Sequence, residues 1–207
     1  MSFSDLLKEI AELSSTGRGF KPHRYLLLLA VLELNKKRLI KNDRVYYNDA
    51  LKIEFRRLLS VHGGEEDRDR PFNPFFHLGS TSFWRLVPAH GRESELHDTQ
   101  SIGGPSQLAD LVQYSELGPE MSRALADEQK STEIEKLILD CLIEGRNSRE
   151  ASVTTIGRSA QRTLHRLSLK NTLDDGGNPF VGYLNSLQRL SAGNENALAE
   201  FQACSEF

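Results

Sequence analysis

The chain has 207 residues, of which 38% are hydrophobic and 27% are charged, enough apolar content for a folded core in one or two domains. Its longest apolar run, residues 25–32, is far shorter than the ~20 residues of a membrane-spanning helix, and the N-terminus has no basic segment followed by an apolar one. We therefore expect a cytoplasmic protein without a membrane partner. Cys141 and Cys204 lack CxxC spacing, so neither a disulfide framework nor a zinc site is predicted.

The net charge of −3 conceals an uneven distribution along the chain. Residues 1–92 carry 16 Lys and Arg against 11 Asp and Glu, a net charge of +5, whereas residues 93–207 carry 10 against 18, a net charge of −8. The basic excess is largest in residues 18–57, with 11 basic and 4 acidic residues. Such an excess is expected where a surface neutralises phosphates, although a solvated helix face with scattered lysines produces the same pattern.

The N-terminal part is predicted to be helical. Ser2 or Ser4 caps a first helix through Leu13, and a second helix follows with Pro22 in its first turn and Tyr25–Leu34 as its buried body. His23 and Arg24 then lie in the first turn, close to the positive end of the helix dipole, where a phosphate is favoured. A third helix is capped by Asn48 or Asp49, and it presents Leu51, Phe55, Leu58 and Leu59 inward and Lys52, Arg56 and Arg57 outward.

Two short strands are predicted next, after a loop over Gly63–Arg70. Phe75–Leu78 and Ser82–Val87 have β propensity and are expected to pair through a tight turn. The remaining helices are predicted at residues 106–114, 119–127, 133–144, 155–169, 180–190 and 194–203. The fold class is therefore α+β and predominantly helical, with a small antiparallel hairpin that is loosely winged-helix-like. A boundary near residues 126–131 separates a recognition domain, residues 1–130, from a helical connector or interaction segment, residues 131–207.

Catalytic and cofactor motifs are missing from the sequence. No GxSxG, GxGxxG, GxxxxGK[ST] or HExxH pattern occurs, and we predict neither a metal site nor a cofactor. Asp49 and Glu54 come nearest to an acidic metal motif, but they lie on a predicted amphipathic helix, where surface charge is the commoner role. The sequence therefore predicts a binding module and no enzyme.

Two short islands about fifty residues apart combine basic or imidazole groups with proline and aromatic residues. They are Lys21-Pro22-His23-Arg24, which opens the leucine-rich helix, and Asn73-Pro74-Phe75-Phe76-His77, which precedes a Phe-Trp strand. With these motifs in this order, residues 15–128 resemble the sulfur-binding domain of the type IV, phosphorothioate-dependent HNH restriction endonucleases. In that family the domain recognises DNA in which sulfur replaces a non-bridging phosphate oxygen.

The resemblance implies roles for individual residues. His23 and Arg24 would contact the backbone at the modified phosphate, and Asn73 and Pro74 would form a pocket wall that His77 completes. Asn73 stands where the family has an aromatic residue, and His77 where it has a small one. Lys21, Arg56, Arg57 and Arg92 are expected as further phosphate contacts, with Arg92 nearest to an arginine that the family places after the hairpin.

These observations predict a DNA-binding recognition module of a restriction or anti-phage system, which binds phosphorothioated double-stranded DNA. Cleavage would then come from a nuclease partner or from a region outside this chain. Two alternatives stay open: a protein-interaction or regulatory subunit that docks a partner through the aromatic island, and a metal-dependent nuclease that uses Asp49 and Glu54.

Overall fold

A computed structural model of the protein describes residues 2–14, 20–64 and 66–171, with the backbone alone described from residue 150 onward. The chain divides into two compact units, residues 1–147 and residues 148–207. The helices predicted at residues 180–190 and 194–203 lie outside the described residues. In the described part, no helix is long and apolar enough to span a membrane.

The first helices begin where local signals predict them. Helix α1, Phe3–Ala11, is capped by Ser2, whose hydroxyl accepts a hydrogen bond from Asp5 N while the Asp5 carboxylate accepts one from Ser2 N. A short 3-10 turn, η1, covers Glu12–Ser14. Helix α3, Asp49–His62, is capped by Asn48, whose side-chain oxygen accepts a hydrogen bond from Leu51 N at 3.1 Å. Both helix starts confirm the predictions.

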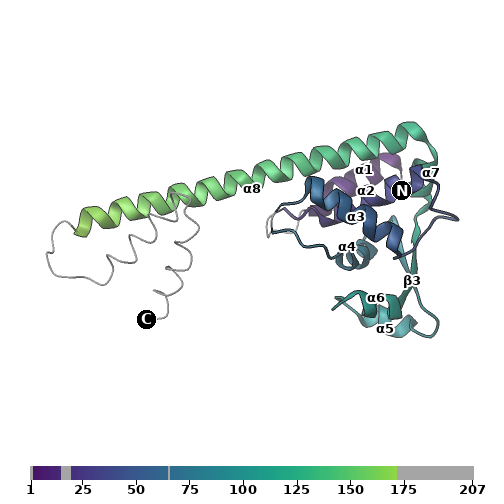
Figure 1. Cartoon of the computed structure of the whole chain (residues 1–207). Helices are drawn as coiled ribbons and strands as arrows, with labels where there is room; N and C mark the ends of the chain where they lie inside the picture. The colour runs from purple at the N-terminus through teal and green to yellow at the C-terminus, as the bar shows by residue number, and fades with distance from the viewer. Residues whose placement is uncertain (1, 15–19, 65, 172–207) are drawn as a thin grey trace. The chain divides into compact units, whose positions relative to one another are not determined.

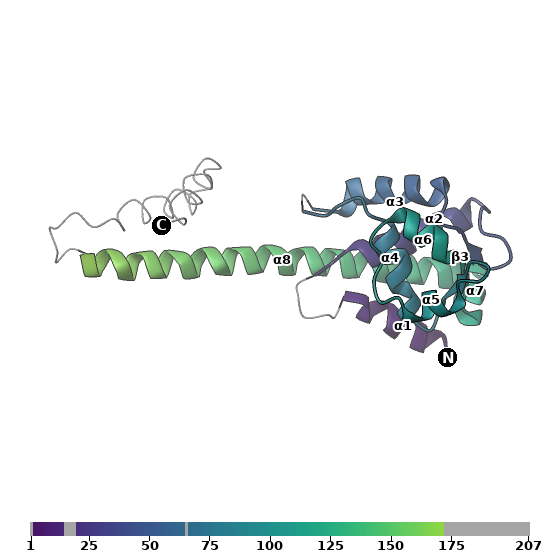
Figure 2. The ribbon, with the colours of Figure 1, turned by 90° about the horizontal axis from the view of Figure 1, so that it is seen from below.

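Helix α2, His23–Lys36, forms the centre of the core. Residues 25–32 are all buried, as expected of a helix that is apolar on every side. The helix packs against α3 and against α4 (Figures 1 and 2). This burial fixes the start of α2, and with it the side chains of the first island.

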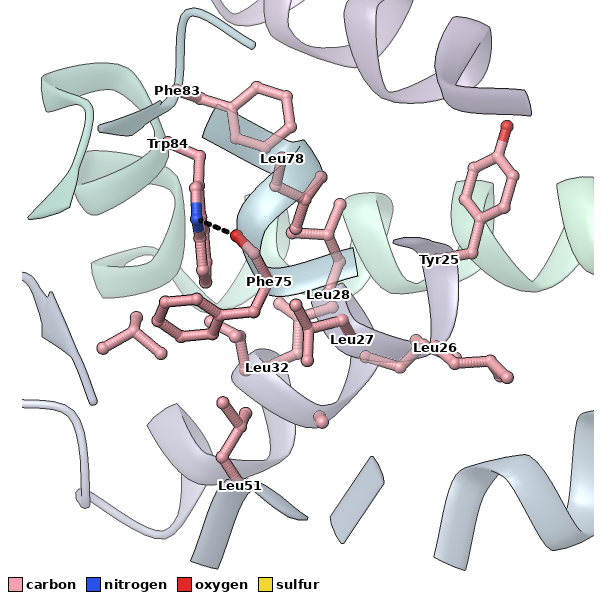
Figure 3. Packing of buried hydrophobic residues seen from close by; sticks show 14 of the residues in the cluster. Tyr25, Leu26, Leu27, Leu28, Leu32, Leu51, Phe75, Leu78, Phe83 and Trp84 are labelled. Carbon is pink, nitrogen blue, oxygen red and sulfur yellow. Dashed lines mark hydrogen bonds between the residues drawn. The ribbon is translucent and has the colours of Figure 1, made fainter. Parts of the chain in front are cut away.

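The first strand of the predicted hairpin is wrong, because Phe72–His77 forms a helix, α4, followed by the 3-10 turn η2 at Leu78–Ser80. Pro71 and Pro74 occupy the helix start, where a missing N–H is tolerated. The Phe75 ring packs edge-on against Trp84, with 5.2 Å between ring centroids, and the Trp84 indole N–H donates to the Phe75 carbonyl at 3.0 Å (Figure 3). Packing at helical spacing therefore overrides the β propensity of the phenylalanines.

The sheet has three antiparallel strands in the order β1-β3-β2. Strand β2, Trp84–Pro88, overlaps the second predicted strand, and β1 comprises only Arg44–Val45. The central strand β3, Val112–Leu117, pairs with both, matching Glu116 with Arg44 on one side and with Arg85 on the other. The helix predicted at residues 106–114 is correct only for its first part: helix α6 covers Pro105–Leu111, and the chain continues directly into β3.

The remaining helices are α5, Glu93–Asp98, α7, Pro119–Ala126, and α8, Glu128–Asn171. Helix α7 matches its prediction, whereas α8 is one continuous helix where two were predicted. In the first unit, α8 buries Ile134, Ile138 and Leu142, which recur every four residues along one face. The α+β, mostly helical fold class is confirmed, with a three-stranded sheet in place of the simple hairpin.

Candidate nucleic-acid interface

The two sequence islands meet where α2 begins and α4 ends. Helices α2 and α4 pack together, and His77 is the last residue of α4. Partial desolvation by the surrounding protein lowers the pKa of His77, and the positive charges of Arg24 and Lys21 lower it further. Like charges have this effect only at short range, so Lys21, Arg24 and His77 share one positive environment.

Lys21 and Arg24 are available to a ligand. Lys21 is exposed and Arg24 is partly exposed, and neither makes an ion pair or hydrogen bond with any residue that the structure describes. Helix α2 begins after Pro22 without a side-chain cap, so its positive dipole end is not offset by a local side-chain acceptor. The surface thus combines two unpaired cations with an uncapped helix start, which favours an anion such as a phosphate.

His23 lies beside these cations but faces the protein. Its ring stacks on Phe55, with 6.4 Å between centroids, and its Nε2 lies 3.2 Å from the backbone oxygen of Arg68. Its Nδ1 is 3.9 Å from the Asp67 carboxylate. His23 therefore links the start of α2 to α3 and to the segment of residues 66–70, which we call the loop 66–70.

The second island offers polar groups and little apolar surface. Asn73 and His77 are four residues apart on α4 and share one face of the helix. Asn73 is half-buried and His77 is exposed, whereas Pro74 is buried. A ligand on this face meets the amide and the imidazole first, because the proline ring is buried.

The three remaining predicted phosphate contacts carry carboxylate partners. Each arginine side chain is at least half exposed, so it can still approach a ligand, but an anion has to compete with the intramolecular pair. The pairs are Arg56 with Asp69 at 2.6 Å, Arg57 with Glu54 at 2.6 Å, and Arg92 with Glu95 at 2.7 Å. Arg92 precedes α5, and within the described residues its ion pair with Glu95 is the only one it makes.

The acidic residues of α3 are engaged in ion pairs and do not converge on a metal site. Glu54 binds Lys37 and Arg57, and Asp49 binds Lys52 at 3.1 Å. Across residues 2–14, 20–64 and 66–149, no group of three or more His, Cys, Asp or Glu side chains is arranged to hold a metal ion. The geometry therefore gives no support to a nuclease centred on Asp49 and Glu54.

Sequence reasoning missed the loop 66–70 as a part of this surface. It treated Gly63–Arg70 as a loop of mixed charge, which is correct for its backbone but does not show which charges face the protein. In the structure the loop packs beside His23 and supports the start of α4, because Asn73 N donates to Arg70 O at 3.2 Å. The alternation of Asp and Arg over residues 67–70 was the available signal.

A comparison with known protein families finds a match. The model of a family described as ScoMcrA-like, DNA sulfur-binding domain matches residues 3–140, which is more than half of the chain. The matched range contains both islands, the loop 66–70 and the whole sheet. No curated protein matches the chain.

Proposed function

The chain belongs to the family of ScoMcrA-like DNA sulfur-binding domains, and on that premise we propose that it reads phosphorothioate-modified double-stranded DNA for a restriction or anti-phage system. Membership makes residues 3–140 a DNA-binding module. The observation that supports this site is the shared environment of Lys21, Arg24 and His77 at the uncapped start of α2.

Affinity would come mainly from the cations. Arg24 and Lys21 meet a phosphate without first giving up a carboxylate partner, and arginine can bind two phosphate oxygens at once. Such contacts release counterions, so DNA binding should weaken steeply with salt. They carry no information about sulfur, because a normal phosphate has nearly the same charge.

Sulfur discrimination needs a different kind of contact. Sulfur in a phosphorothioate is larger and less strongly hydrated than oxygen, so it loses less when it leaves water for an apolar surface. The Pro74 ring, between Asn73 and the aromatic residues of α4, is the apolar group that we assign to this role. His77 borders the site from the end of α4.

We further propose that DNA cleavage, if it follows recognition, is performed by a nuclease partner or by a domain outside this chain. The proposed site contains cations, an amide and an imidazole, which can hold a phosphate. Its own side chains include no cluster of carboxylates for the metal ions that commonly assist phosphodiester hydrolysis.

The test is a competition binding titration at two salt concentrations, with matched duplexes that carry either a normal phosphate or one stereodefined phosphorothioate. We expect the wild type to prefer the phosphorothioate by about 1–3 kcal/mol, the size of one good buried contact. Pro74→Ala should remove the preference and keep binding to both duplexes, whereas Arg24→Ala should weaken both.

Two matched controls separate these effects from general damage. Pro119→Ala also removes a proline from the first turn of a helix, at an exposed position on α7, and should keep the preference. Arg85→Ala removes an exposed arginine that pairs with Glu116 on the sheet, and it should keep the affinity. Equal binding of both duplexes by the wild type would reject the sulfur pocket, and no binding by a folded protein would reject DNA recognition.

A further inference from the structure

The loop 66–70 is held in place at both ends. Asp67 N donates to Gly64 O at 3.0 Å, and the Asp67 carboxylate accepts from Gly64 N at 2.9 Å. The backbone oxygen of Arg68 lies 3.2 Å from His23 Nε2, and that of Arg70 accepts from Asn73 N at 3.2 Å. The loop is therefore fixed against the two islands, and side chains that leave it start from defined positions.

The two aspartates of the loop have partners within the protein. The Asp67 side chain is only 4% exposed and lies beside His23. Asp69 accepts a hydrogen bond from Arg56 Nε at 2.6 Å, and its negative charge also contributes, after burial, to raising the pKa of Tyr47. The Asp67 carboxylate thus has a backbone donor in Gly64, and the Asp69 carboxylate has a charged partner in Arg56 of α3.

The two arginines of the loop are not compensated. Arg68 and Arg70 are exposed, and neither side chain makes a hydrogen bond, ion pair or ring contact with any residue in the described ranges. The Arg68 and Arg70 side chains are therefore available to a ligand, and the contact between the Arg68 oxygen and His23 Nε2 places the loop beside the first island.

We propose that Arg68 and Arg70 are two further phosphate contacts of the DNA-binding surface, adjoining Lys21 and Arg24 across His23. This proposal rests on the proposed function, because it extends the same site. An exposed arginine with no internal partner gives up no ion pair when it binds a phosphate, and its planar guanidinium matches two phosphate oxygens. Contact with phosphate rather than with bases makes the contribution independent of DNA sequence and of sulfur.

The experiment measures affinity against salt concentration for the full chain with the normal and the phosphorothioate duplex. Each alanine variant, Arg68→Ala and Arg70→Ala, should weaken binding to both duplexes by roughly three- to tenfold and reduce the slope of log K against log salt by about 0.9. Arg68→Lys keeps the charge and should keep the slope. Arg85→Ala, which removes an exposed arginine on the sheet, is the control for general loss of positive charge.

A variant that is expected to strengthen DNA binding provides a second test. Asp69→Asn removes a negative charge from the loop and releases Arg56, so it should strengthen binding to both duplexes by a few-fold. Because the Arg68 and Arg70 side chains support nothing inside the described part of the fold, their alanine variants should unfold at the same urea concentration as the wild type. A loss of binding then reports on contact with DNA.

Unchanged affinity and slope in both alanine variants would overturn the proposal, and so would a loss confined to one base sequence, since that indicates base contacts. The failure of the sulfur hypothesis is distinguishable from either result. If the wild type binds both duplexes equally while Arg68→Ala and Arg70→Ala weaken both, sulfur reading fails and the phosphate contacts stand. If the wild type prefers the phosphorothioate duplex and both alanine variants bind as tightly as the wild type, sulfur reading stands and the phosphate contacts of Arg68 and Arg70 fail.

Discussion

The ion-pair cluster of Glu54 gives the most direct test of how this fold places charge. The Glu54 carboxylate is nearly buried, at 6% exposed, and accepts from Lys37 Nζ at 2.7 Å and from Arg57 Nε at 2.6 Å. Lys37 follows α2 and Glu54 belongs to α3, so the pair ties the two central helices together. Glu54→Gln keeps the shape of the side chain and removes its charge.

The expected cost follows from the exposure of the partners. Breaking a fully buried ion pair costs about 3–5 kcal/mol, because a charge stays buried without compensation. Here the charges that remain are those of Lys37 and Arg57, which are 52% and 53% exposed and can be hydrated by water. The substitution therefore costs only part of the strength of two charge-assisted hydrogen bonds. We expect Glu54→Gln to lower the free energy of unfolding by about 1–2 kcal/mol at pH 7.

The effect should also depend on pH. Burial by itself would raise the pKa of Glu54, but the hydrogen bonds from Lys37 and Arg57 outweigh it and hold the pKa below its usual value. A carboxylate whose pKa is lower in the folded state stabilises the protein above the unfolded-state pKa and loses that contribution as pH falls through the folded-state pKa. The difference between wild type and Glu54→Gln should thus be constant near neutral pH and shrink below about pH 4.5.

Urea unfolding followed by tryptophan fluorescence measures this difference, because Trp84 is the only tryptophan and is fully buried in the first unit. A change of 1–2 kcal/mol corresponds to a midpoint shift on the order of 0.5–1 M urea. Glu95→Gln is the matched control: it removes the partner of Arg92 at the same spacing of three residues, but at 53% exposure, and should cost under about 0.5 kcal/mol. Equal stability of Glu54→Gln and wild type at pH 7, or a difference that persists at pH 3, would refute the reasoning.

Two further predictions concern the surroundings of the site. A Cβ on Gly145 of α8 would overlap the ring of Phe20, so Gly145→Ala should lower the free energy of unfolding by about 1–3 kcal/mol in the same urea titration. Gly104→Ala is the control, because a Cβ there meets no other atom, and its free energy of unfolding should be close to that of the wild type. Partial desolvation and the neighbouring cations lower the pKa of His77 in the folded state. Protonation of His77 therefore favours the unfolded state. The free energy of unfolding should fall as the pH decreases through about 6.5 toward the lower pKa of the folded state. His77→Gln should show a smaller fall between pH 7 and 5, and an identical pH profile would contradict the lowered pKa.

The helices that were predictable from sequence are those with local signals. The capping box at Ser2 and the cap at Asn48 each involve side chains within three residues of the backbone groups they satisfy, so a single stretch of sequence contains the whole interaction. The leucine run of α2 was also predictable from local sequence, because apolar residues on all sides of a helix indicate that it is buried, whichever elements pack against it. None of these predictions depended on the rest of the fold.

The strands were harder to predict, because their partners are distant. Arg44 pairs with Glu116, and Trp84 pairs with Leu117, so neither β1 nor β2 finds its partner in the next segment of sequence. A prediction that joins neighbouring segments therefore produces a hairpin. The run Phe75–Leu78 was mistaken for its first strand because a short aromatic stretch does not distinguish a strand from a buried turn of helix.

The site was predictable only in part from the sequence. The resemblance to a sulfur-binding domain pointed to the two islands, and the family match confirms that resemblance. The ion pairs of Arg56 and Arg57 were not predictable, because the choice of partner depends on which carboxylates the fold brings near. Asp69, for example, lies 13 residues from Arg56, across the end of α3 and the following loop.

The distribution of carboxylates suggests how the fold separates a binding surface from ordinary surface charge. Arg57 and Arg92 each have an acidic residue three positions away in sequence, so their charge is compensated locally. Lys21 and Arg24 have none in the described structure, and both lie near His77, whose pKa their charges lower. The buried helix α2 packs against α4 and so fixes the backbone of Arg24 beside that helix. A phosphate placed beside Lys21 and Arg24 is attracted by both charges, and no carboxylate of the described residues pairs with either cation in its place.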